Sequence, residues 1–231
     1  MLAASTIFSA LAYLLLTDKE LSLLDQGESL FLLGEVILSL GLVLSAASAS
    51  SAISGEMEAG TLECLLLTPI NHWQVAVDKL LTIVSLWLIL YVVSIPYLIV
   101  LASGTNLALS AVLYVGVYGT LLVSAVSSLA IAISARSNSK SSMLATLMVV
   151  LLLLAPSLFF ATSLKNTDFG LALESINPVS HAVNSLDSVL VDNEQALTQQ
   201  VIHFVPVVIF LLLCVLIFLW YTRRLEVRSI E

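Results

Sequence analysis

Uncharged apolar runs about as long as a bilayer is thick constrain this chain most. The run 144–155, for example, holds no charged residue, and its apolar flanks extend it on both sides. A helix of about 20 apolar residues crosses the roughly 30 Å hydrocarbon core of a membrane. Backbone groups in hydrocarbon must bond internally, which leaves helices or closed barrels. Barrel strands alternate apolar and polar residues, and these runs do not. The sequence therefore predicts an all-α membrane protein.

The composition excludes a water-soluble globular fold of this length. Of the 231 residues, 59% are hydrophobic and 10% are charged, whereas soluble domains typically carry about 25% charged residues. The net charge of −8 carries little weight, because most of the acids fall in two loops that we place outside the membrane. We therefore expect residues 1–231 to form a single transmembrane domain.

Six apolar segments predict six transmembrane helices. Their approximate bounds are 2–16, 30–52, 80–102, 107–134, 142–164 and 201–221. The first is shorter than a full span and could instead be the hydrophobic region of a signal peptide. It lacks a basic start and a convincing small-residue cleavage site, so we interpret it as a short or truncated first span.

Lysine and arginine positions predict the orientation, because cytoplasmic loops are enriched in both. With both termini inside, six of the eight basic residues lie in cytoplasmic segments: Lys79, Arg136, Lys140, Arg223, Arg224 and Arg228. The outer loops then hold Lys19 and Lys165. The sequence thus predicts a multi-pass protein of the inner (cytoplasmic) membrane with cytoplasmic termini. It also predicts a structured outer loop over 165–200, with short helices near the outer leaflet.

The loop 54–78 is the most informative segment. In a helix, Glu56, Gly60 and Glu63 share one polar face, and the opposite face is rich in leucine. Pro69 ends such a helix. The pattern predicts a short amphipathic helix at the cytoplasmic surface, between spans two and three. From spacing alone, an ordinary surface helix with its apolar side toward lipid fits equally well.

The residue types in this loop resemble those of ABC-2-type transporter permeases. That family carries a glutamate, a Gly-Thr-Leu-Glu run, leucines, a Thr-Pro pair and then a lysine at the next span. The corresponding residues are Glu56, Gly60-Thr61-Leu62-Glu63, Leu65 to Leu67, Thr68-Pro69 and Lys79. The span number, the orientation and the long last outer loop are also similar. A second, weaker resemblance lies in Asn177-Pro178 with Ser180 and His181.

The resemblance implies a coupling helix that rests against a cytoplasmic ABC ATPase subunit. It places these residues at the ATPase contact: Glu56, Gly60, Thr61, Glu63, Thr68 and Pro69. The chain would then be the permease subunit of an ATP-driven transporter, expected to be an exporter. It would work beside a second permease copy or a paralogous permease, surrounded by membrane lipid.

Cofactors and enzyme chemistry are not expected in this chain. No Gly-x-x-x-x-Gly-Lys-Ser/Thr phosphate loop occurs in the sequence, so ATP and Mg²⁺ would be bound by the partner ATPase. His72, His181 and His203 fall in three separate regions, which does not favour a metal site. We predict no catalytic residues and no nucleic-acid partner.

Two alternatives remain open from the sequence. One is a permease like those of the haem-exporter B family in cytochrome c maturation, which are similar in length and share a Gly-x-Leu-Glu loop. The other is a secondary transporter or scaffold protein without an ATPase. Secondary transporters often show internal repeats and intramembrane charges. Glu35 is the one acid well inside an apolar run; it is a candidate functional acid, or it reaches the headgroups. The substrate is not predicted.

Overall fold

The computed structural model describes residues 2–17, 26–60, 72–103, 105–159, 167–191 and 197–222. Within these ranges the regular elements are all helices, so the predicted all-α fold is confirmed. In chain order they are α1 (Leu2–Thr17), α2 (Gln26–Ser50), α3 (Ser54–Glu58), α5 (His72–Leu101), α6 (Ala108–Ser134), α7 (Ser139–Leu154), the π-helix η2 (Ala155–Phe159), α9 (Asp168–Ile176), α10 (Pro178–Leu190) and α11 (Leu197–Thr222).

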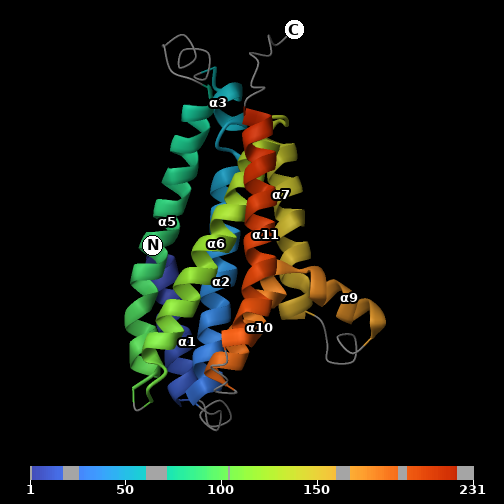
Figure 1. The fold of residues 1–231 in the computed structure, drawn as a ribbon. Coiled ribbons are helices and arrows are strands. Elements are labelled where there is room, and N and C mark those ends of the chain that lie inside the picture. The colour runs from blue at the N-terminus through green and yellow to red at the C-terminus, as the bar shows by residue number, and fades with distance from the viewer. Residues whose placement is uncertain are drawn as a thin grey trace.

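The long helices lie side by side in one bundle, in which α6 packs against α2, α5 and α11 (Figure 1). Among the described residues, five helices are long and apolar enough to cross a membrane: 26–58, 74–101, 108–134, 139–157 and 200–221. Helix α1 has 16 residues, or about 24 Å at 1.5 Å per residue. Five of the six predicted spans are therefore present as membrane-length helices. The remaining one, the first in the chain, is a shorter apolar helix.

Two helix ends differ from the predicted bounds. Helix α5 begins at His72, so Asp78 and Lys79 lie in the helix and not in the preceding loop. The apolar run marks only the hydrocarbon-crossing part of a helix, and polar turns can extend it into water. Helix α7 passes into η2 at Ala155, and Pro156 lies inside this π-helical turn. A proline that removes a backbone donor commonly accompanies such a turn and a bend.

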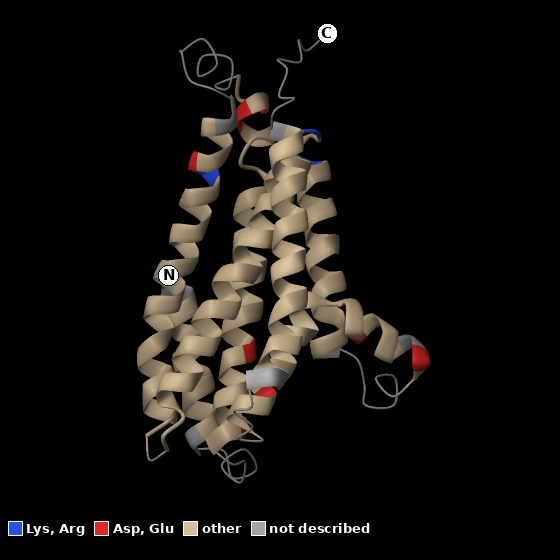
Figure 2. Cartoon of the chain, viewed as in Figure 1, with Lys and Arg blue, Asp and Glu red and all other residues tan. Residues whose placement is uncertain are grey.

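Basic residues gather at one end of the bundle. Figure 2 shows the described lysines and arginines, which are Lys79, Arg136 and Lys140, at the end that also holds α3. We call this the basic end. Helices α9 and α10 belong to the other half of the bundle, which we call the opposite end (Figure 1). The two helices occupy the segment that the sequence predicts to be structured.

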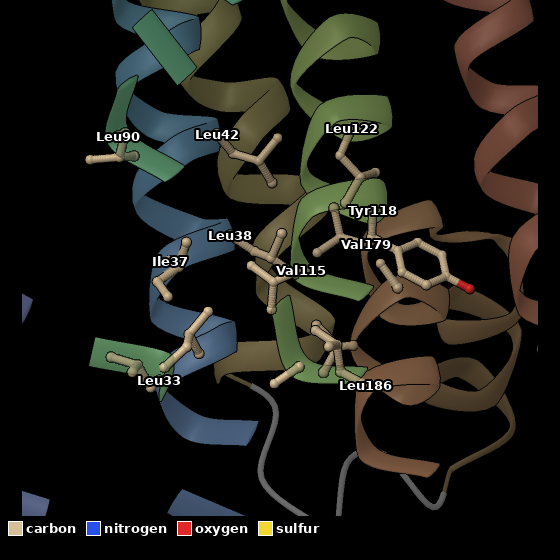
Figure 3. Packing of buried hydrophobic residues seen from close by; sticks show 14 of the residues in the cluster. Leu33, Ile37, Leu38, Leu42, Leu90, Val115, Tyr118, Leu122, Val179 and Leu186 are labelled. Atoms are coloured by element: carbon tan, nitrogen blue, oxygen red, sulfur yellow. The ribbon is translucent and has the colours of Figure 1, made fainter. Parts of the chain in front are cut away.

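The core is built by branched side chains from α2, α5, α6 and α10 (Figure 3). Leu33 and Leu42 of α2 are buried, as are Val115 of α6 and Leu186 of α10. Helix α10 is amphipathic, and its apolar face closes the opposite end of the core. It is therefore an integral part of the bundle, although it is too short to cross a membrane.

Trp87 occupies a slot between three helices. This α5 residue is 2% exposed, and its ring lies against Gly41 of α2 and Gly119 of α6. A Cβ atom on Gly119 would overlap Cζ2 of Trp87 and lie 2.6 Å from Cη2. A Cβ on Gly41 would lie 2.5 Å from Cε3. The indole therefore fits only because both facing positions lack side chains.

Asn177 joins α7 to α10 at the opposite end. Its side-chain Nδ2 donates to the Leu153 carbonyl oxygen at 2.7 Å, and its Oδ1 accepts from the Val179 backbone N–H at 2.9 Å. It thus caps α10 and satisfies a carbonyl just before the π-helical turn. This explains physically why an asparagine precedes Pro178, whose ring suits the first helical position.

We predict that Asn177→Ala lowers the free energy of unfolding by about 1–3 kcal/mol, because it leaves a buried N–H group and a partly buried carbonyl without this partner. The measurement is the thermal unfolding midpoint of the purified protein in detergent. Asn138→Ala is the matched control, since Asn138 precedes α7 but makes no side-chain cap hydrogen bond. Equal shifts for the two variants would contradict the assignment.

Candidate functional site

The predicted coupling segment begins at the basic end, where α2 ends and α3 follows after the turn 51–53. The start of α3 is packed into the bundle, because Ile53 and Ser54 are each only 1% exposed. Its far side is open: Glu58, Ala59 and Gly60 are exposed. The segment is therefore fixed on one side and accessible to a partner on the other.

Two acidic side chains attach α3 to neighbouring helices. Glu56 forms an ion pair with Lys79 in the second turn of α5, and the two side chains are 27% and 30% exposed. Glu58 Oε1 accepts a hydrogen bond from the Ser139 backbone N–H at 2.8 Å. That bond satisfies a first-turn donor of α7, which Asn138 leaves uncapped. A movement of α3 would therefore act on α5 near Lys79 and on α7 at its first residue.

A cluster of four buried serines joins the start of α3 to α2, α6 and α7. We call it the serine clamp, and it consists of Ser50, Ser54, Ser134 and Ser142. Ser134 Oγ of α6 accepts from the backbone N–H groups of Ile53 and Ser54 at 3.2 and 3.0 Å. The hydroxyls of Ser54 and Ser134 lie 3.0 Å apart.

The clamp also reaches α7. Ser54 Oγ donates to the Ser50 carbonyl oxygen at 3.2 Å, and Ser142 Oγ donates to the same oxygen at 2.6 Å. One carbonyl at the end of α2 thus receives two hydroxyls. The end of α2 is thus packed against α3 and α7 within the chain.

The helical face that the sequence predicts through Glu56, Gly60 and Glu63 is not continuous. Helix α3 ends at Glu58, and Gly60 adopts a φ of 70°. This left-handed conformation is favourable for glycine and typically ends a helix. The prediction of a single helix across Gly60 was therefore wrong, because periodicity alone cannot show that a glycine serves as a stop.

Five predicted residues remain, four of them after Gly60 in the sequence. Thr61, Glu63, Thr68 and Pro69 lie outside the described residues. Glu35 is half-buried in α2 and takes part in a polar or electrostatic interaction. It precedes Glu56 by 21 positions, or roughly 30 Å along a helix axis. The structure therefore does not bring Glu35 to the coupling segment.

Sequence reasoning missed most of this site. It identified Glu56 and Lys79 from the motif. It did not identify Ser134 or Ser142, because serine is common in this sequence. Their role can be recognised only from the fold, because 80 positions of sequence separate Ser54 from Ser134. No spacing rule connects residues on helices that first meet in the folded bundle.

Two histidines that are distant in sequence meet at the opposite end. Nδ1 of His181 on α10 lies 3.3 Å from Nδ1 of His203 on α11, and His181 Nε2 lies 3.0 Å from the Ser175 carbonyl oxygen. Two of the three histidines that lie in separate regions of the sequence are therefore neighbours in the fold. Within the described residues, no group of three or more His, Cys, Asp or Glu side chains could hold a metal ion.

An apolar groove runs between α6 and α11 at the opposite end. Its volume is about 260 Å³, and its lining comprises Leu113, Tyr114, Val117, Tyr118, Gln200, Val201 and Phe204. Gln200 is held in place, because its amide bonds Ser185 and Ser188 of α10 at 2.6 and 3.1 Å. The groove is thus separate from the coupling segment, which lies at the basic end.

Comparison with known proteins identifies the family of this chain. The family model for the ABC-2 family transporter protein matches residues 1–228. No curated protein matches the chain. The family match covers both the serine clamp at the basic end and the helices α9 and α10 at the opposite end.

Proposed function

Because the chain belongs to the ABC-2 transporter family, a family of membrane transport subunits that work with ABC ATPases, we propose that it is the permease of an ATP-driven exporter. In this proposal it crosses the cytoplasmic membrane with both termini inside and moves its substrate outward. A separate ATPase subunit binds ATP and Mg²⁺. The observation that carries the proposal is the family match across residues 1–228.

The basic end supports the proposed orientation. Lys79, Arg136 and Lys140 all lie there, and short cytoplasmic loops are enriched in Lys and Arg. The same end holds α3, whose exposed residues would then face the cytoplasm, where an ATPase is available. We therefore assign the ATPase contact to the segment that contains Glu56, Gly60, Thr61, Glu63, Thr68 and Pro69.

The local geometry supports a mechanical role for this segment. Its described part is anchored to α5 by the Glu56–Lys79 ion pair and to α7 by the Glu58–Ser139 bond. A push from an ATPase on the exposed side would therefore reach two membrane-length helices directly. We propose that two permease copies, or this chain and a paralogous permease, form the translocation path between them.

We predict that an ABC ATPase subunit co-purifies with the chain after gentle detergent extraction. Reconstituted together in lipid vesicles, the pair should hydrolyse ATP faster than the ATPase alone, because the permease couples its closure to helix movement. The measurements are mass spectrometry of the purified complex and phosphate release. Recovery of the folded chain without any ATPase would overturn the proposed function as an ATP-driven permease. That result would favour a secondary transporter or scaffold.

A further inference from the structure

Ser134, the last residue of α6, forms hydrogen bonds outside its own helix. Its side chain is fully buried, and it bonds another segment of the chain, the start of α3. By contrast, Ser128 on the same helix is equally buried, and its hydroxyl donates back to the Ala125 carbonyl oxygen at 2.8 Å. Ser134 Oγ therefore serves as an acceptor between elements.

The bonds of Ser134 replace the cap that α3 lacks. Ile53, at the N-cap of α3, provides no side-chain hydrogen bond to the helix. Ser134 Oγ accepts instead from the N–H groups of Ile53 and Ser54. Because Ile53 and Ser54 are buried, water cannot readily substitute for this acceptor. The start of α3 is thus fixed to the last turn of α6.

We infer that Ser134 is a positioning residue through which a push on α3 moves α6, with Ser142 passing the same movement to α7. This inference rests on the proposed function and names the route inside the membrane domain. The serine clamp makes the route stiff, because four buried serines share bonds around one turn of chain. The Glu56–Lys79 pair is more exposed and supplies a separate link to α5.

The test compares Ser134→Ala and Ser142→Ala with the matched control Ser128→Ala in the full chain. The first measurement needs no partner: hydrogen exchange of the segment 51–58 in lipid nanodiscs. Ser134→Ala removes the acceptor of two backbone N–H groups. Because loss of even one hydrogen bond corresponds to a several-fold change in opening, we expect at least about fivefold faster exchange in Ser134→Ala. Ser128→Ala should exchange as the wild type does.

The second measurement uses the ABC ATPase that co-purifies with the wild type. We expect Ser134→Ala to bind it with an unchanged Kd, while ATPase stimulation by the permease falls about fivefold or more. Ser142→Ala should show a smaller loss, and Ser128→Ala none. A role limited to stability would lower the melting temperature of all three variants and leave the stimulation of the folded fraction unchanged.

The outcomes separate this inference from the proposed function. Unchanged exchange in Ser134→Ala, or full ATPase stimulation by it, overturns the positioning role while the permease assignment stands. If the wild type binds no ATPase, the proposed function fails. Faster exchange in Ser134→Ala would then still support the anchoring of α3, and equal exchange in all variants would overturn it.

Discussion

Reversing two charges, in the variant Glu56→Arg/Glu63→Arg, is expected to abolish permease-dependent ATPase stimulation while the protein still inserts and folds. The proposed ATPase contact presents acidic side chains, which can pair with basic residues of the partner. Reversal replaces attraction by repulsion, and like charges across an interface cost several kcal/mol. The measurement is ATPase stimulation and co-purification, with the amount of folded chain quantified by size-exclusion chromatography.

The fold should tolerate the change at Glu56. Its ion pair with Lys79 is partly exposed, and pairs of that kind typically contribute about 0–1 kcal/mol to stability. The matched control is Asp168→Arg/Glu174→Arg, which makes the same change in net charge on α9 at the opposite end. The control should retain wild-type stimulation, since α9 lies away from the proposed contact.

A charge exchange separates the two roles that Glu56 can have. Glu56→Lys/Lys79→Glu restores an ion pair within the chain but leaves a positive charge where the ATPase would meet a negative one. We expect it to remain uncoupled. Recovery of stimulation would show that Glu56 acts only through Lys79, which would remove it from the ATPase contact.

Filling the slot around Trp87 should clearly lower the stability of the bundle. In Gly119→Ala, the new methyl group would overlap the six-membered ring of Trp87. Helix α5 must then shift away from α6, or the indole must leave its position. Overpacking of this kind costs about 1–3 kcal/mol. We expect a clearly lower unfolding midpoint in detergent, measured by circular dichroism at 222 nm (the ordinary helix band).

Gly55→Ala is the matched control for the backbone. The nearest atom to its added Cβ is Ser51 Cβ at 3.8 Å, an ordinary contact distance. Since alanine favours helix over glycine by about 0.5–1 kcal/mol, this variant should be neutral or slightly stabilised. A loss equal to that of Gly119→Ala would show that the effect does not come from the indole.

The double variant Gly119→Ala/Trp87→Phe tests the contact itself. Phenylalanine lacks the indole atoms Cζ2 and Cη2 that the new methyl group meets. The substitution also removes no hydrogen bond, because Trp87 Nε1 has no acceptor among the described residues. We therefore expect Trp87→Phe to destabilise the wild type through lost packing but to cost less in the Gly119→Ala background. Strict additivity would contradict the slot.

The sequence was sufficient to predict a membrane protein and the five membrane-length helices among the described residues, because an uncharged run such as 144–155 has no other stable environment. It also located Glu56 and Lys79, which the structure joins. The start of α5 was placed too late, since hydropathy detects the hydrocarbon boundary and not the end of the hydrogen-bonded helix. Gly60 was predicted to lie on the polar face of a longer helix, although its left-handed φ is incompatible with a continuous helix at this position.

The packing partners could not be predicted. Gly41, Trp87 and Gly119 lie on three different helices, and nothing in their local sequence connects them. The same holds for Ser54 with Ser134, and for His181 with His203. Each of these contacts depends on the relative rotation of whole helices, which is decided by the sum of many small packing terms. Single-sequence periodicity gives the face of a helix but not its partner.

The Trp87 slot also divides α5 into two arms of unequal length. Lys79 lies eight residues before it and Leu101 fourteen residues after it, or about 12 Å and 21 Å along the axis. For a rigid rod pivoting at the indole, the far tip would travel roughly 1.8 times as far as the tip near Lys79. Tyr97 lies on the longer arm and is hydrogen-bonded to Ser5 of α1 at 3.1 Å. A small displacement beside the proposed ATPase contact would thus become a larger one at the opposite end of the bundle, and α1 would follow it.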